Sequence, residues 1–258
     1  MEEKELLKLQ NGSDIRGVAC EGVEGEKVNL TPLSSNIISQ SFASWLSKKT
    51  GKAVNELKIG IGRDSRITGD SLANAAKAGL LSMGVDVTDC GMATTPAMFM
   101  SIVFEETSFD GSIMITASHL PFNRNGLKFF DKDGGLEHED ITAILEGAAG
   151  LTEKASEKQA ETFDLISLYA EHLVKTIKSG IKNSSEKPLA GLKIVVDAGN
   201  GAGGFFVSKI LKELGRIQKA VSSWNRTECF QTTFLTRKMQ KQWKQSSQLF
   251  LKTKPIWA

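Results

Sequence analysis

Segments with strand spacing alternate with segments of helical spacing between residues 57 and 118, and this alternation constrains the fold more than any other feature. The strand-like segments are 57–61, 85–91 and 111–118, and the helix-like segments between them are 70–84 and 94–105. Strands joined through helices require right-handed crossovers, which place them parallel in one sheet with helices on both faces. We therefore expect an α/β fold: a three-layer α/β/α domain with a mostly parallel mixed sheet.

The sequence after residue 118 predicts the rest of this first domain, which we place at residues 1–150. GLKFF (126–130) and the DKDGG turn that follows indicate a short hairpin or excursion. Residues 138–150 have the spacing of a closing helix. The first domain is therefore expected to hold all the strands named so far.

Residues 151–215 predict a linker and the start of a second α/β/α domain. A polar, charged stretch leads into an amphipathic helix around 164–178. LKIVV at 192–196 then indicates a strand, which GNGAGG (199–204) and a helical segment follow. GNGAGG lacks the spacing of a dinucleotide-binding or P-loop motif, so a tight turn is the favoured interpretation over a nucleotide site.

Composition limits the classes of function. The chain has 258 residues, 40% of them hydrophobic and 24% charged, and contains no run of eighteen apolar residues. Its first ten residues are acidic and resemble no targeting segment, so we expect a cytoplasmic protein with no membrane or nucleic-acid partner, leaving a plastid location open. Cys20, Cys90 and Cys229 lack zinc-site spacing. His138 and His172 lie among charged residues and are expected to be surface groups.

Ser118 ends the strand-like segment 111–118 and begins the loop SHLPFNRNG. Serine is common at strand ends for purely structural reasons, so a nucleophile and a polar terminating residue are both open at this point. In parallel sheets, however, the loops that leave the carboxyl ends of strands carry the chemistry. His119, Arg124 and Lys128 follow closely, and two arginine-containing loops, GSDIRG with Arg16 and GRDSR at 62–66, occur earlier. Such cations are what phosphoryl transfer requires.

Four segments taken together resemble a known enzyme family. GSDIRG, GRDSR, TASHLPFNRNGLKF and VVDAGNGAGG, in this order, resemble the α-D-phosphohexomutases, over residues 9–215. The resemblance implies that Ser118 carries a transferable phosphoryl group with His119 beside it. It also implies that Arg16 and Lys128 lie close to the phosphoserine, for proton transfer or charge stabilisation. Leu120 stands where the family usually has asparagine.

The resemblance implies a phosphotransferase that interconverts hexose 1-phosphate and hexose 6-phosphate, of glucose or mannose, through a 1,6-bisphosphate. It further implies Mg²⁺ bound through the phosphate on Ser118, and glucose 1,6-bisphosphate as activator. Full-length relatives have four domains, and the aspartate loop for Mg²⁺ lies in a part of them that we do not find here. We therefore expect weak Mg²⁺ binding and a chain inactive alone. A non-catalytic binding or regulatory protein with the same fold is the alternative.

Residues 216–258 differ in kind from the rest of the chain. They hold 9 lysines and arginines against one acidic residue, three of the four tryptophans and none of the 24 glycines. Trp224, Met239, Trp243 and Trp257 have one codon each, and a shift of one nucleotide upstream turns them into residues that fit a family-like continuation of LKELG. We therefore interpret 216–258 as a frameshifted, non-native tail, expected to be poorly ordered, rather than as a basic nucleic-acid-binding segment.

Overall fold

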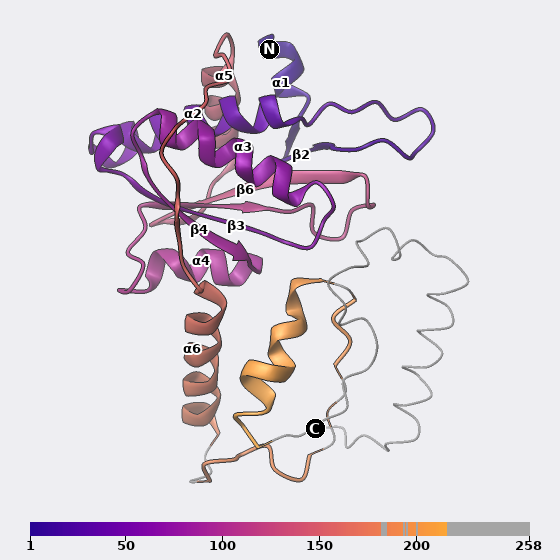
Figure 1. Ribbon diagram of the computed structural model, residues 1–258, viewed down its shortest axis with the longest axis vertical. Helices are drawn as coiled ribbons and strands as arrows, with labels where there is room; N and C mark the ends of the chain where they lie inside the picture. The colour runs from indigo at the N-terminus through magenta and orange to yellow at the C-terminus, as the bar shows by residue number, and fades with distance from the viewer. Residues whose placement is uncertain (182–184, 193, 195, 200, 216–258) are drawn as a thin grey trace. The chain divides into compact units, whose positions relative to one another are not determined.

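The computed structural model describes residues 1–181, 185–192, 194, 196–199 and 201–215. The predicted frameshifted tail, residues 216–258, lies outside the described residues. By its contacts the chain divides into two compact units, Met1–Leu165 and Ile166–Ala258. The first unit contains all the strands of the described residues, and Figure 1 shows its sheet in magenta and purple.

One sheet forms the middle layer of the first unit, with its strands in the order β1-β2-β6-β5-β3-β4-β8 and β7 paired to β6. The strands are β1 Gln10–Asn11, β2 Asp14–Val18, β3 Lys58–Arg63, β4 Asp86–Met92, β5 Gly111–Ile115, β6 Arg124–Asp131, β7 Gly134–Gly135 and β8 Glu161–Thr162. β5, β3, β4 and β8 pair in parallel, whereas β1, β2, β6, β5 and β7 are joined by antiparallel pairings. The predicted mixed sheet is confirmed, with a larger antiparallel part than the sequence indicates.

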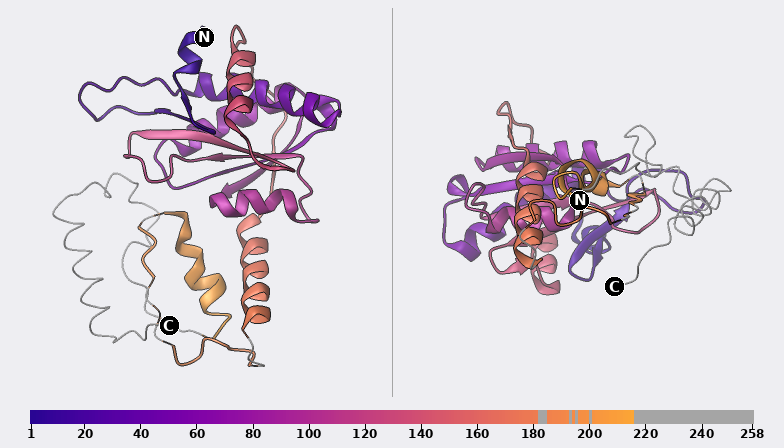
Figure 2. Two further views of the ribbon diagram at one scale, coloured as in Figure 1. Left: turned by 180° about the vertical axis from the view of Figure 1, so that it is seen from behind. Right: turned by 90° about the horizontal axis from the view of Figure 1, so that it is seen from below.

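Helices cover both faces of this sheet, so the three predicted layers are present (Figure 1 and Figure 2). The helices are α1 Glu3–Leu7, α2 Pro32–Thr50, α3 Gly69–Ser82, α4 Thr95–Val103 and α5 His138–Ala148, with a short 3₁₀ turn η1 at Val54–Glu56. α2, α3 and α5 lie on one face and α4 on the other (Figure 1). No helix of the described residues is long and apolar enough to cross a membrane.

Helix α2 is set by its ends and not by an apolar stripe. Thr31 caps its first turn by accepting a hydrogen bond from the N–H of Ser34, Pro32 occupies the first helical position, and Gly51 ends it at φ +74°. Its buried positions include polar residues: Ser34, Ser35, Asn36, Ser39, Gln40 and Ser41. Asn36 Nδ2 donates to the carbonyl of Ala75 at 3.0 Å and Ser35 Oγ donates to that of Leu72 at 2.9 Å, so these two polar side chains join α2 to α3.

The first unit extends to Leu165 and not to residue 150, because the segment expected to be a linker packs back onto it. Gln40 Nε2 donates to the carbonyl of Thr152, and Asn36 exchanges hydrogen bonds with both backbone groups of Lys154. Strand β8 then adds to the edge of the sheet in parallel with β4. These contacts satisfy backbone groups that a free linker would leave to water.

The described part of the second unit is mainly helical. It holds α6 (Leu165–Gly180), a 3₁₀ turn η2 (Ala202–Gly204) and a π-helical segment η3 (Phe206–Leu211), with a small core of Ala170, Ile210 and Leu214. The predicted helix around 164–178 is confirmed. The strand predicted at 192–196 falls partly outside the described residues, which here are 192, 194 and 196.

Asp110 gives the fold a pH-dependent contact. Its buried carboxylate accepts hydrogen bonds from Lys52 Nζ at 2.7 Å and from the Lys58 N–H, where β3 begins, at 3.1 Å. Burial raises the pKa of Asp110, but the hydrogen bonds from Lys52 and Lys58 lower that pKa by more, so it lies below its ordinary value of 3.8. A lowered folded-state pKa stabilises the fold above the unfolded-state pKa, and this contribution is lost as pH falls through the folded-state value.

We therefore expect Asp110→Asn to lower the free energy of unfolding near neutral pH, with a difference from the wild type that shrinks as the pH falls below 3.8. Urea unfolding of both proteins across that range is the measurement. A difference that stays constant with pH would contradict the prediction. Asp133→Asn is the control, because Asp133 is 79% exposed and pairs only with Lys49 among the ion pairs of the described residues.

Candidate active site

Ser118 lies just beyond the carboxyl end of β5, as the sequence predicts. Ser118 and His119 are exposed, while the residues of β5 before them are buried. Ser118 Oγ lies 3.4 Å from His119 Nδ1, and the Ser118 N–H donates to Thr116 Oγ1 at 2.9 Å. Ser118 has φ +54°, in the left-handed region that non-glycine residues seldom adopt. A residue that only ends a strand needs neither an exposed hydroxyl nor a strained backbone. Both features of Ser118 therefore favour a functional role.

Arg66 lies beneath the loop that follows Ser118, with a side chain that is 0% exposed. Its two terminal nitrogens donate to four backbone carbonyls at 2.8 Å each: those of Ser118, Leu120, Pro121 and Arg124. One guanidinium therefore fixes the path of the whole loop. The sequence analysis placed GRDSR among the arginine-containing loops but did not single out Arg66.

Asp64 is the carboxylate nearest this buried arginine. Its Oδ2 accepts a hydrogen bond from Thr116 Oγ1 at 2.6 Å and lies 3.4 Å from Arg66 Nε, and its Oδ1 accepts from the Arg66 N–H. Burial raises the pKa of Asp64, although the bonds from Thr116 and Arg66 act in the opposite direction. Burial also disfavours the charged form of Arg66, and so lowers the pKa of its guanidinium. The pair is therefore kept in the interior at an electrostatic cost.

Arg16 and Lys128 share one carboxylate on the face of the sheet that carries α4. Arg16 Nη2 and Lys128 Nζ each lie 2.7 Å from a different oxygen of Asp14. Arg16 also donates to the carbonyl of Thr116, two residues before Ser118. Both cations therefore lie beside the strand that leads to Ser118. Arg16 belongs to strand β2 (Asp14–Val18) and not to a loop, because residues 15–18 pair with β6.

Gly126 makes the placement of Arg16 possible. It lies opposite Arg16 in the pairing of β2 with β6. A Cβ added there would lie 2.8 Å from Arg16 Cδ and 2.1 Å from the carbonyl oxygen of Ile15. The side chain of Arg16 therefore crosses the space that any other residue at 126 would fill.

A second set of contacts, which the sequence analysis did not anticipate, ties the Ser118 loop to residues 19–30. Glu26 accepts hydrogen bonds from Asn123 Nδ2 at 2.7 Å and Arg124 Nη2 at 2.8 Å, and these bonds lower its pKa. The N–H of Ala19 donates to the Asn123 carbonyl at 2.7 Å. Arg124, a cation that the sequence places near Ser118, is thus already engaged on the outer side of the loop.

The other candidates are not drawn into this site. His138 lies within hydrogen-bond distance of Gln10 at the start of α5, and His172 is exposed on α6. Gly199 turns at φ +55°, with its N–H bonded to Asp197 Oδ1, as a tight turn requires. Burial raises the pKa of the Cys90 thiol to about 12. The described residues contain no group of three or more His, Cys, Asp or Glu side chains that could hold a metal ion.

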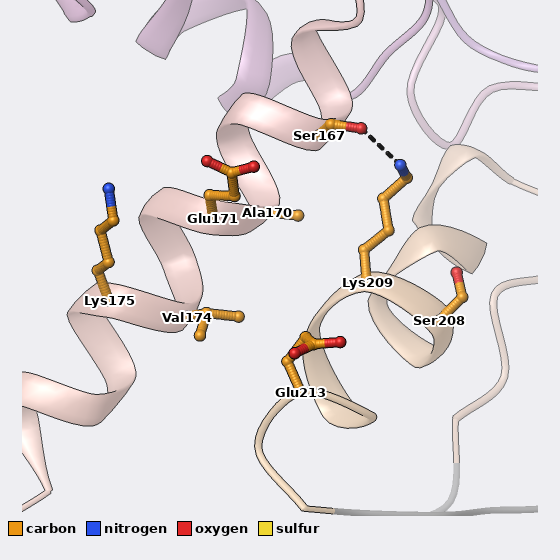
Figure 3. A pocket seen from close by; sticks show the side chains of 8 residues that line it. All are labelled: Ser167, Ala170, Glu171, Val174, Lys175, Ser208, Lys209 and Glu213. Atoms are coloured by element: carbon orange, nitrogen blue, oxygen red, sulfur yellow. Dashed lines mark hydrogen bonds between the residues drawn. The ribbon is translucent and has the colours of Figure 1, made fainter. Parts of the chain in front are cut away.

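The second unit has a pocket of its own between α6 and η3 (Figure 3). It has a volume of about 520 Å³ and is lined by Ser167, Ala170, Glu171, Val174, Lys175, Ser208, Lys209 and Glu213. Lys209 Nζ donates to Ser167 Oγ at 2.5 Å across it. None of the residues grouped around Ser118 lines this pocket.

Comparison with protein families gives one match. Residues 7–156 match phosphoglucomutase/phosphomannomutase, alpha/beta/alpha domain I. Phosphoglucosamine mutase of Alkaliphilus oremlandii is 34% identical over 209 residues, and that of Alkaliphilus metalliredigens is 36% identical over 216 residues. Each alignment covers 81% of this chain and 44% of the relative. The chain thus spans less than half the length of these relatives.

Solved structures also match most of this chain and less than half of their own length. A phosphoglucomutase/phosphomannomutase family protein from Burkholderia thailandensis superposes with a TM-score of 0.64 at 25% identity, covering 89% of this chain and 47% of its own. The fold is also that of a putative phosphomannomutase from Thermus thermophilus, with a TM-score of 0.63 at 24% identity and coverage of 82% and 45%.

Proposed function

Because the chain belongs to the phosphoglucomutase/phosphomannomutase family through its first α/β/α domain, we propose that Ser118 accepts and donates the phosphoryl group of a sugar-phosphate mutase reaction. The observation that carries the proposal is the exposed, left-handed Ser118 at the carboxyl end of β5, with Arg16 and Lys128 beside the strand that leads to it. Phosphoryl transfer depends on positioning and on positive charge near the transferred group, and these residues supply both.

Each transfer can be written so that bonds and protons balance. A hydroxyl oxygen of the sugar phosphate bonds to phosphorus as the bond from phosphorus to Ser118 Oγ breaks. The hydroxyl loses its proton, and Ser118 Oγ regains one. We assign His119 Nδ1, which lies 3.4 Å from Ser118 Oγ, as the group that gives Ser118 Oγ its proton. Arg16 and Lys128 offset the charge of the transferred group. The bisphosphate then returns its other phosphoryl group to Ser118 by the reverse steps.

We assign a hexose phosphate as the substrate class. The sequence favours glucose or mannose, whereas the relatives of Alkaliphilus are named phosphoglucosamine mutases, so glucosamine phosphate joins the candidates. We assign the residues described near Ser118 to the phosphate and not to the sugar ring. The choice among sugars is therefore assigned to parts of the relatives beyond the matched 44% of their length.

The described residues do not make a magnesium site by themselves. Mg²⁺ prefers about six oxygen ligands, and the carboxylates described around Ser118, including Glu26, are already engaged. Asp14 is shared by Arg16 and Lys128, and Asp64 is bonded to Thr116 and Arg66. We propose that Mg²⁺ binds this chain weakly, through the phosphate on Ser118, and that glucose 1,6-bisphosphate is the phosphoryl donor.

Incubation with glucose 1,6-bisphosphate should add one phosphoryl group to the full chain at Ser118. The reason is that the hydroxyl is exposed and that Arg16 and Lys128, beside the strand that leads to it, would offset the charge of about −2 on the phosphate. Intact-mass measurement of the wild type and of Ser118→Ala checks this: the wild type should gain the mass of one phosphoryl group and the variant none.

Ser108→Ala is the matched control. Ser108 is also exposed and also left-handed, at φ +46°, but it precedes β5 and so lies at the opposite end of the strand. It should not affect phosphate incorporation. An equal phosphate load on wild type and Ser118→Ala, or none on the wild type, would overturn the proposed function.

A further inference from the structure

We propose that Arg66 is the positioning residue of the phosphorylated loop: it holds the backbone from Ser118 to Arg124 in the geometry that receives a phosphate dianion. This inference rests on the proposed function of Ser118. It concerns a residue that touches neither the Ser118 hydroxyl nor any substrate in the described contacts. Arg66 acts through the loop, by the four carbonyl hydrogen bonds that its two terminal nitrogens make.

Arg66 and Asp64 together grip the two peptide groups that flank Ser118. The carbonyl of Ser118 accepts from Arg66 Nη2 at 2.8 Å. The N–H of Ser118 donates to Thr116 Oγ1, whose own hydroxyl donates to Asp64 Oδ2 at 2.6 Å. A left-handed conformation is unfavourable for a non-glycine residue, so it persists only where the surroundings fix it. These two chains of hydrogen bonds are what fixes it here.

The direction of the carbonyls has a consequence for an anion. The peptide unit that joins Ser118 to His119 is trans, so its N–H points away from its carbonyl. Because the Ser118 carbonyl points at the buried Arg66, the N–H of His119 points away from that arginine. The exposed residues Ser118 and His119 thus present a backbone donor outward, where a phosphate oxygen could accept it.

Only arginine has the donors for this task. A guanidinium carries five N–H donors in a fixed plane, whereas a lysine ammonium carries three at one point. Arg66 uses its two terminal nitrogens for four carbonyls spread over residues 118–124. Lysine at position 66 would keep the charge beside Asp64 but could not reach carbonyls at both ends of the loop.

The test is Arg66→Lys in the full chain, with Arg63→Lys as the matched control. Arg63 is the last residue of β3 and pairs with Asp70 at 2.5 Å, but it makes no hydrogen bond to residues 118–124 among the described contacts. Amide hydrogen exchange should become at least about 10-fold faster in residues 117–124 of Arg66→Lys, because the loop loses hydrogen bonds to a charged group. Exchange within α5 should match the wild type in both variants.

The second readout is the initial rate of phosphate transfer from glucose 1,6-bisphosphate to the chain. Arg66→Lys should lower the maximal rate at least about 10-fold and leave the half-saturating bisphosphate concentration unchanged, because the loop acts in the transfer step. A purely structural role would leave this rate unchanged once the variant is folded. Unchanged exchange, or faster exchange with a wild-type transfer rate, would overturn the proposal.

Two further outcomes have their own interpretation. If the wild type takes no phosphate, the proposed function fails, while the exchange readout still decides whether Arg66 positions the loop. If Arg66→Lys does not fold, Thr116→Val tests the same idea, because it removes the acceptor of the Ser118 N–H and leaves Arg66 in place. It should slow transfer in the same way, and a wild-type rate in folded Thr116→Val would contradict the role assigned to this hydrogen-bonded network.

Discussion

Asp64→Ala should lower the free energy of unfolding by about 3–5 kcal/mol, which is among the largest effects that one substitution can have in this unit. The carboxylate removed is the nearest counter-charge of the buried Arg66 and the acceptor for the Thr116 hydroxyl. Although burial disfavours the charge on Asp64 and on Arg66 alike, removing one partner leaves the other without compensation. Urea unfolding followed by circular dichroism measures the loss.

Asp70→Ala provides the comparison for Asp64→Ala. Asp70 pairs with Arg63 at 2.5 Å, but its side chain is 73% exposed, so water replaces it when it is removed. Such exposed pairs are worth about 0.2–1 kcal/mol. If Asp64→Ala lost no more stability than Asp70→Ala, the buried pair would not have the importance that we give it.

Gly126→Val should be the most damaging glycine substitution near the candidate site, with a loss of about 3 kcal/mol or more. A Cβ at this position would lie 2.1 Å from the carbonyl oxygen of Ile15 and 3.0 Å from that of Thr116. Backbone atoms cannot rotate away as side chains can, so β2 and β6 would have to separate. Arg16 would be displaced at the same time, and phosphate incorporation at Ser118 should fall.

Thermal unfolding and intact-mass measurement together check this prediction. Gly135→Val is the control, since a Cβ there lies 3.9 Å from its nearest neighbours, which are atoms of Lys128 and Phe130. It should leave both readouts close to those of the wild type. A midpoint for Gly126→Val equal to that of Gly135→Val would show that the two strands can yield at this point.

The sequence predicted the centre of the first unit well because its strands are apolar and its helices have regular spacing. β3, β4 and β5 with α3 and α4 between them lie where the alternation predicts them. Helix α2 gave a weaker signal, since buried positions such as Ser35, Asn36 and Gln40 carry polar side chains that donate to backbone carbonyls of α3 and of residues 152–154. Those partners are distant in sequence, so no local pattern could reveal them.

The candidate site was predicted in part. Ser118 could be placed because loops at the carboxyl ends of parallel strands converge. Arg66 could not be singled out, because a buried arginine has the same sequence signature as an exposed one; only the carbonyls around it reveal its role. The strand position of Arg16 was missed for a related reason. β2 is a strand only because β6 lies beside it, and Asp14–Val18 has no apolar alternation strong enough to indicate this.

The return of residues 151–162 to the first unit has a practical consequence for anyone who wishes to isolate the domain. Cutting the chain at residue 150 would remove β8 and leave β4 as an open sheet edge, which invites association with other chains. It would also remove the backbone partners that Asn36 and Gln40 find in residues 152–154. A fragment that ends at Leu165 keeps both the edge strand and these partners, so it carries the Ser118 loop on an intact scaffold.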